Sequence, residues 1–158
     1  MAAVTIRVSP EPLDPAAELA PLKKIPGVGA VVTFSGICRD EEGRLSALEL
    51  EHYPGMAEGE IARIVDEARA HWPLLAATVV HRVGVIPVGD DIVLVATASG
   101  HREAAFAAAE FLMDYLKTRA PFWKKEHAAK AGEGPWVGHS ETDDRRAARW
   151  KTPVKTGS

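Results

Sequence analysis

The chain has 158 residues, of which 46% are hydrophobic and 26% charged, and its formal net charge is −3. This balance is typical of one soluble globular domain, excludes wholesale disorder and argues against a general nucleic-acid binder. Its single cysteine, Cys38, excludes an internal disulfide and a cysteine-based metal cluster, and it suits the reducing cytoplasm, which is the expected location. No apolar run approaches the roughly 20 residues of a membrane-spanning helix.

The first third of the chain predicts three strands and a short helix. Apolar and polar residues alternate over Val4–Val8, which predicts a strand, and a short helix is expected over 16–24. The β-branched and aromatic run Gly29–Ser35 predicts a buried strand, and alternating Leu and Glu predict another over Leu45–His52. Because a polar loop joins these last two strands, we expect them to pair as a hairpin.

The middle of the chain predicts a helix followed by a second hairpin. Apolar residues at helical spacing predict a helix over 57–72, which Pro73 ends. Strands are expected over 77–85 and 92–98, with the turn Pro87–Asp90 between them.

The longest predicted helix begins at Gly100 or His101 and ends near Arg119, and a strand over 122–126 is expected to pair with Trp136 and Val137. The irregular alternation of strands and helices predicts an α+β fold, with a mixed or antiparallel sheet, hairpins and two main helices. Residues 1–150 are expected to form a single domain and 151–158 a flexible tail.

A candidate anion site lies at Ser99–Arg102, where a strand leads into a helix. A helix start leaves backbone N–H groups unpaired and carries partial positive charge, to which His101 and Arg102 add their side chains. The residues therefore predict a site for an anion or a phosphate. The alternative is an ordinary capped helix with a solvated arginine.

Four cations crowd one short segment of this acidic chain: Lys117, Arg119, Lys124 and Lys125. Neighbouring cations disfavour each other's charged forms, and a lysine in such a setting can act as a general base or a nucleophile. The alternative is a solvated basic face. Helix geometry places Lys117 beside the apolar stripe, where a lysine either extends to solvent or lines a pocket.

The remaining candidates are weaker. Arg39 lies in a loop after a strand, where it is either a ligand contact or an ordinary surface arginine. Cys38 is interpreted as structural, because nothing adjacent to it favours a thiolate. The histidines lack metal-ligand spacing, and the chain has neither a P-loop nor a dinucleotide-binding fingerprint. No metal and no cofactor are expected.

Five segments form an ordered pattern over roughly residues 4–150. They are Gly29–Gly36 with Arg39, Leu50–Met56, His81–Gly84, Ser99–Arg102 and Met113–Glu126. In order and spacing they resemble the large, catalytic subunit family of molybdopterin synthase. The last segment is the longest and the most specific part of the resemblance.

The resemblance implies a hammerhead-like α/β architecture and a sulfurtransferase of molybdenum cofactor biosynthesis. Such an enzyme converts cyclic pyranopterin monophosphate to molybdopterin. The sulfur comes from the Gly-Gly thiocarboxylate terminus of a small ubiquitin-like subunit, whose tail inserts into a pocket of the large subunit. Two large subunits form a central homodimer with a small subunit at each end, a heterotetramer that needs neither nucleic acid nor a membrane.

The resemblance also implies roles for individual residues. Lys117 and Lys124 match the family's catalytic lysines, and the substrate-binding positions fall on Arg39, His101, Arg102, Lys125 and Glu126. The chain departs from the pattern at Ile37, where some relatives carry a lysine. It also departs near Trp136, where relatives can carry an arginine that contacts the neighbouring subunit's substrate and where His139 is the candidate replacement.

Helix geometry adds a constraint of its own. Arg102 and Lys117 are separated by 15 residues in the sequence, which is roughly 22 Å along a helix at ~1.5 Å per residue. One small pterin cannot easily reach both ends. We therefore expect a site shared across the homodimer, with His101 and Arg102 contributed by the second subunit.

Two alternative functions remain at this point. A non-catalytic adaptor would dock the ubiquitin-like tail, and it would need the groove but neither the lysines nor the anion site. A stand-alone phosphometabolite-binding module would bind its ligand without a protein partner. The joint presence of Lys117, Lys124, Arg39 and Arg102 favours the enzyme.

Overall fold

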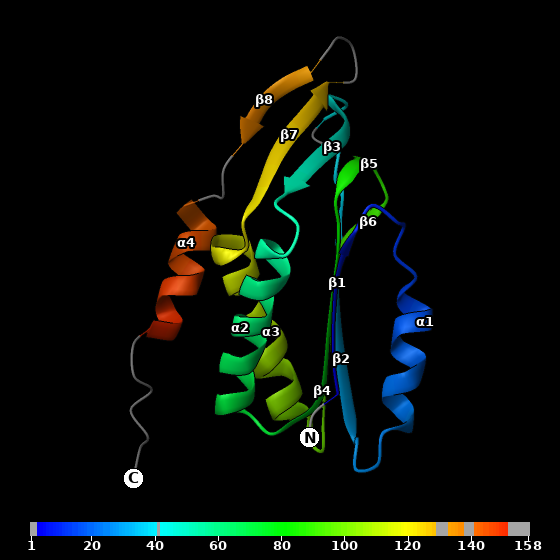
Figure 1. Ribbon diagram of the computed structural model, residues 1–158, viewed down its shortest axis with the longest axis vertical. Helices are drawn as coiled ribbons and strands as arrows, with labels where there is room; N and C mark the ends of the chain where they lie inside the picture. The colour runs from blue at the N-terminus through cyan, green and yellow to red at the C-terminus, as the bar shows by residue number, and fades with distance from the viewer. Residues whose placement is uncertain (1–2, 41, 129–132, 138–140, 152–158) are drawn as a thin grey trace.

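The computed structural model describes residues 3–40, 42–128, 133–137 and 141–151. They form two four-stranded sheets that meet end to end (Figure 1). The long helices α2 (Met56–His71) and α3 (Arg102–Arg119) cover one face of the first sheet. The predicted α+β class, with mixed and antiparallel strands and two main helices, is confirmed.

The first sheet has the strand order β1-β4-β6-β2. Its strands are β1 (Ala3–Ser9), β4 (Leu74–Arg82), β6 (Asp91–Ser99) and β2 (Ala30–Ile37). β1 runs parallel to β4, whereas β4–β6 and β6–β2 are antiparallel. The predicted second hairpin is confirmed as β4 and β6, two strands that are buried over most of their length.

The second sheet has the order β5-β3-β7-β8. Its strands are β5 (Gly84–Pro87), β3 (Leu45–His52), β7 (Phe122–Ala128) and β8 (Glu133–Val137). Lys125 pairs with Trp136 and Lys124 with Val137, which confirms the predicted return of the chain onto β7.

The predicted hairpin of β2 and β3 is wrong, because β2 pairs with β6 and β3 pairs with β5 and β7. Two backbone hydrogen bonds explain why β2 and β3 lie in different sheets. The N–H group of Cys38 donates to the carbonyl of Asp90, and the N–H group of Gly89 donates to the carbonyl of Cys38. These bonds hold the end of β2 against the turn before β6, so that the chain enters β3 in the other sheet.

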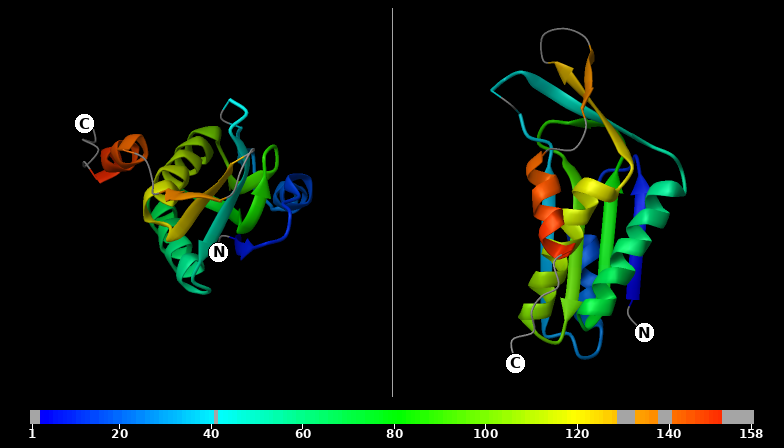
Figure 2. Two further views of the ribbon diagram at one scale, coloured as in Figure 1. Left: turned by 90° about the horizontal axis from the view of Figure 1, so that it is seen from above. Right: turned by 90° about the vertical axis from the view of Figure 1, so that its left-hand side faces the viewer.

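The remaining described helices are short. α1 (Pro15–Leu19) and the 3-10 helix η1 (Ala20–Lys24) lie on the face of the first sheet opposite α2 and α3 (Figure 2). α4 (Glu141–Ala148) and η2 (Arg149–Lys151) follow β8. No helix of the described ranges is long and apolar enough to cross a membrane. His139 and, apart from Lys151, the predicted tail lie outside the described residues.

The largest core cluster lies between the first sheet and the two long helices. α2 contributes Ile61, Ile64, Val65 and Ala68, and α3 contributes Ala108, Phe111, Leu112, Tyr115 and Leu116. Small alanines on α3 allow a close approach to the sheet, where the buried Thr97 hydroxyl donates to the carbonyl of Ala105 at 2.6 Å. This contact positions the start of α3 on β6.

Gly29 allows a second close approach, between its own backbone and the backbone of Gly100 just before α3. Its N–H group donates to the Ser99 carbonyl at 3.0 Å, and a Cβ atom at Gly29 would lie 2.3 Å from the carbonyl oxygen of Gly100. The obstructing atom belongs to the backbone and cannot rotate away. A side chain at Gly29 must therefore displace the segment that leads into α3.

We predict that Gly29→Ala lowers the free energy of unfolding by about 1–3 kcal/mol, the usual cost of overpacking. The matched control is Gly59→Ala within α2, where an added Cβ meets nothing within 4 Å. Alanine in a helix interior is favoured over glycine by about 0.5–1 kcal/mol, so this control should stabilise the protein. Urea denaturation of both variants measures the two effects, and equal stabilities would contradict the clash.

Candidate functional site: a lysine pocket at the junction of the sheets

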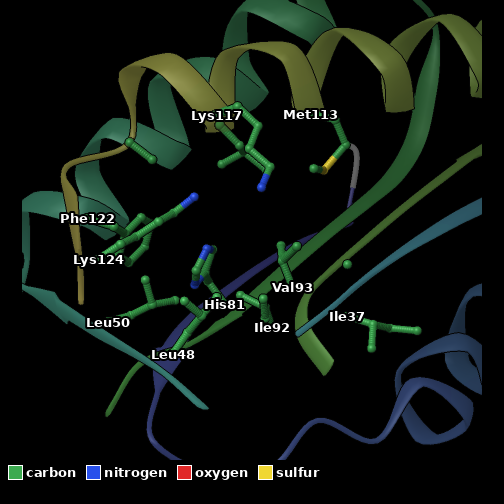
Figure 3. A pocket seen from close by; sticks show the side chains of 13 residues that line it. Ile37, Leu48, Leu50, His81, Ile92, Val93, Met113, Lys117, Phe122 and Lys124 are labelled. Carbon is green, nitrogen blue, oxygen red and sulfur yellow. The ribbon is translucent and has the colours of Figure 1, made fainter. Parts of the chain in front are cut away.

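A pocket of about 110 Å³ lies where the two sheets meet, under the C-terminal end of α3 (Figure 3). Three nitrogen-bearing side chains enter it: Lys117 from α3, Lys124 from β7 and His81 from β4. Much of the remaining wall is apolar, with Leu48, Leu50, Ile92, Val93, Met113 and Phe122. Two cations in such surroundings favour an anionic ligand.

Strand alternation places Lys124 in the pocket. On β7, Lys124 lies opposite Leu50 of β3, and the side chains of an opposed pair point to the same face of a sheet. Lys125, one residue later, lies opposite Glu49 on the other face. Glu126 returns to the face of Lys124 but is absent from the described lining of the pocket. Of these three predicted site residues, the structure brings only Lys124 to Lys117.

His81 occupies the floor of the pocket in a fixed orientation. Its Nδ1 atom lies 2.8 Å from the carbonyl oxygen of Arg82, and its ring stacks on Phe122 with centroids 4.0 Å apart and planes 15° apart. Because a carbonyl oxygen only accepts, we assign the proton of the neutral ring to Nδ1. Nε2 is then the atom with a lone pair.

The imidazole is neutral at pH 7. Burial lowers the pKa of His81 to about 4, and the charges of Lys117 and Lys124 act in the same direction. The hydrogen bond with Arg82 opposes this change without overcoming it. The pocket therefore combines two amino groups with one uncharged acceptor.

Arg119, the fourth member of the basic group, points elsewhere. Its guanidinium donates to Glu60 at 2.9 Å and to both carboxylate oxygens of Glu67 at 2.9 and 3.0 Å. These bonds join the end of α3 to α2. Arg119 is thus a structural ion-pair partner, whereas Lys117 and Lys124 enter the pocket.

The predicted anion site is separate from the lysine pocket. His101 and Arg102 are exposed and line a hollow with Gly29 and Ala30, at the opposite end of α3. Arg39 is exposed after β2 and belongs to neither described lining. The structure therefore places four of the predicted residues in two sites within one chain, and it leaves Arg39, Lys125 and Glu126 outside both described linings.

An apolar groove between β2 and α3 connects these two sites. Its lining includes Phe106, which it shares with the hollow at Arg102, and Met113 and Lys117, which it shares with the lysine pocket. Phe34 on β2 and Phe106 on α3 are 40% and 61% exposed along it. Large apolar side chains exposed in one groove are typical of a contact surface.

Sequence reasoning missed His81 as a pocket residue. Apart from its place in the resembling segment His81–Gly84, His81 was considered only for metal-ligand spacing, which concerns several histidines together. The available signal was an ionisable residue after the apolar run of the strand predicted over 77–85, which the structure shows as the interior strand β4. Such a residue is rarely buried without a partner.

Comparison with known proteins agrees with this architecture. The family model described as MoaE protein matches residues 8–119. The molybdopterin synthase catalytic subunit of Mesorhizobium japonicum is 61% identical over 151 residues, 95% of this chain and 95% of that protein. The structure of molybdopterin cofactor biosynthesis protein E from Burkholderia multivorans has a TM-score of 0.80 at 47% identity, covering 95% of this chain and 98% of that one.

A more distant structure shares the fold. It is the complex of subunits 1 and 2 of molybdopterin-converting factor from Helicobacter pylori, in which one chain has a TM-score of 0.66 at 21% identity. The match covers 85% of this chain and 94% of that one. Fold and pocket together define an α+β protein in which two lysines from different elements line one largely apolar pocket. The chain belongs to the MoaE protein family, as the five sequence segments indicated.

The pKa of His81 has a consequence for stability. The folded-state pKa of about 4 lies below the ordinary value of 6.5, so the unfolded chain binds more protons between these two pH values. The free energy of unfolding should therefore fall as the pH drops from about 6.5 to about 4. The contribution of His81 to this loss is at most about 3 kcal/mol.

We predict that His81→Gln, which cannot titrate, loses less stability over this pH range than the wild type. Urea denaturation at pH 7 and at pH 4.5 measures the difference, with the carboxylates common to both proteins as the internal control. An identical loss in the two proteins would contradict the prediction, because it would show that the pKa of His81 is the same in the folded and the unfolded state.

Proposed function

We propose that this chain is the catalytic subunit of a molybdopterin synthase, in which Lys117 and Lys124 carry the proton transfers of sulfur insertion. The observation that supports this proposal most directly is that the side chains of Lys117, from α3, and Lys124, from β7, enter the same largely apolar pocket. The curated relatives that share the fold over nearly their whole length bear that enzyme's name. The substrate is cyclic pyranopterin monophosphate and the product is molybdopterin.

The proposed sulfur transfer requires groups that move protons, which the two lysines of the pocket can supply. The thiocarboxylate sulfur is the nucleophile, so no catalytic cysteine is needed, and Cys38 is buried with its pKa raised, chiefly by that burial. Opening the cyclic phosphate and removing oxygen from carbon both require proton transfer. In this proposal Lys117 is the principal acid and base, and Lys124 assists it or positions the partner's terminus. Arg39, His101 and Arg102 bind the substrate's phosphate.

The partner is a small ubiquitin-like subunit that inserts its C-terminal Gly-Gly thiocarboxylate into the lysine pocket. Two observations support this. The Helicobacter pylori relative was solved as a complex of two different subunits, and the pocket has two cations for a terminal anion. The reaction takes place in the cytoplasm. Glu126, on the same face of β7 as Lys124, contacts the inserted tail next to the pocket, whereas Lys125 lies on the other face.

We predict that Lys117→Ala lowers the rate of molybdopterin formation by about 100-fold or more, the usual contribution of a positioned acid or base. The assay combines the protein, a thiocarboxylated small subunit and cyclic pyranopterin monophosphate, and it detects molybdopterin. Lys23→Ala is the matched control, because Lys23 is exposed on η1 across the sheet. Undiminished product would move the acid–base role to Lys124, and partner binding without any product from the wild type would favour an adaptor.

The proposed site also needs a second copy of the chain. α3 is continuous from Arg102 to Arg119, so Arg102 and Lys117 stay roughly 22 Å apart along its axis. A two-fold axis at the groove of Phe34 and Phe106, perpendicular to α3, would place two α3 helices antiparallel. In that arrangement His101 and Arg102 of one copy approach Lys117 of the other.

We predict that Lys117→Ala and Arg102→Ala proteins, each nearly inactive alone, regain activity when they are unfolded together and refolded. Equal mixing makes half of the dimers mixed, and each mixed dimer has one complete site. The mixture should therefore recover about one quarter of wild-type activity. Mixing two batches of Lys117→Ala is the control, and no recovery in the Lys117→Ala and Arg102→Ala mixture would show that both residues act within one chain.

A further inference from the structure

The floor of the lysine pocket carries a group that the proposed mechanism does not use. We propose that Nε2 of His81 accepts a hydrogen bond from the last backbone N–H group of the inserted peptide tail, while Lys117 and Lys124 bind its terminal carboxylate or thiocarboxylate. This inference rests on the proposed function, because it takes the tail of the small subunit as the occupant of the pocket.

The backbone of His81 is held in the sheet, and the orientation of its ring is set by two contacts that leave Nε2 as its acceptor. β4 is a central strand, in which His81 pairs with Val8 of β1 and with Val93 of β6. The Nδ1–H group donates to Arg82, and Phe122 stacks on the ring. A rotation of the imidazole would break the hydrogen bond with Arg82 and disrupt the stack on Phe122, so the lone pair keeps its direction.

The balance of donors and acceptors in the pocket specifies the ligand. Lys117 and Lys124 supply only donors, and His81 supplies an acceptor in the same pocket (Figure 3). A bare anion satisfies the lysines but offers nothing to Nε2. A peptide terminus offers both groups that are needed, a carboxylate for the lysines and an N–H group for Nε2. Only one Cα atom separates its last N–H group from the carboxylate carbon.

The size of the pocket also favours a chain end made of small residues. A volume of about 110 Å³ holds roughly four waters at ~30 Å³ each, which limits the ligand to a narrow chain end. Gly36 lines the pocket, where an added Cβ would lie 2.7 Å from Val93 Cγ1. A side chain at position 36 would therefore displace Val93, another residue of the pocket wall.

The surroundings keep His81 an acceptor across the working pH range. The charged or titratable groups that act on it are Lys117 from α3, Lys124 from β7 and His52 from β3, and its pKa of about 4 reflects burial first and these groups second. A protonated ring would replace the acceptor with a donor and place a third cation in the pocket.

Two substitutions separate this role from a structural one. His81→Gln can place an amide oxygen near the position of Nε2 but loses the Nδ1 contact with Arg82. His81→Asn can keep a donor near the position of Nδ1 but has no acceptor where Nε2 was. A ligand role predicts that the glutamine variant functions better, and a purely structural role predicts the reverse.

The measurement is the calorimetric affinity of each purified variant for a small subunit with an ordinary Gly-Gly carboxylate end. We expect His81→Asn to bind about 5- to 100-fold more weakly than the wild type, because a buried N–H group loses its acceptor. His81→Gln should recover most of that affinity. A small subunit that lacks its last two residues should bind the wild type and both variants equally.

The outcomes distinguish the inference from the function on which it rests. Equal affinities of the wild type and His81→Asn for the intact tail, or a loss that persists with the truncated tail, overturn the role of His81 alone. Tighter binding by His81→Asn than by His81→Gln overturns it as well. Failure of the wild type to bind the small subunit overturns both the inference and the proposed partner.

Discussion

The packing of α3 on β6 and β2 is the constraint on which both parts of the candidate site depend. Alanines on the buried stripe bring the helix close to the sheet, and Thr97 fixes its first turn through the carbonyl of Ala105. At Gly29 the absence of a Cβ permits the approach of the chain before the helix. Because the helix is rigid, these contacts at its start also determine where Lys117 lies, about four turns later.

The other end of α3 is held by charge rather than by close packing. Arg119 joins it to Glu60 and Glu67 of α2. The buried Asp114 accepts hydrogen bonds from Arg146, Arg149 and Trp150, which attach α4 and η2 to the side of α3. Removal of Asp114 would leave several donors at a buried position without their acceptor. The lysine pocket therefore opens next to a helix end that is held on two sides. A ligand that binds there does not have to order this part of the chain, so less conformational entropy is lost on binding.

Sequence periodicity predicted what depends on neighbours along the chain. The two long helices and the hairpin of β4 and β6 follow from local spacing and a turn. The partner of β2 was predicted wrongly, because the preference of its apolar residues for β6 over β3 is decided by contacts more than fifty residues away. The convergence of Lys117, Lys124 and His81 has the same origin. They come from α3, β7 and β4, and only the pairing of β7 with β3 turns Lys124 toward the other two.

The structure also resolves the two interpretations of the basic segment, and it does so residue by residue. Arg119 is used in the structural network with α2, and Lys125 lies on the face of β7 opposite the pocket. Lys117 and Lys124 enter a pocket with a largely apolar wall, where a positive charge is costly unless an anion accompanies it. His81 adds a hydrogen-bond acceptor there without adding charge, because burial and the two lysines oppose its protonation. An anionic chain end with an adjacent N–H group therefore matches both kinds of group in the pocket, the two lysine donors and the histidine acceptor.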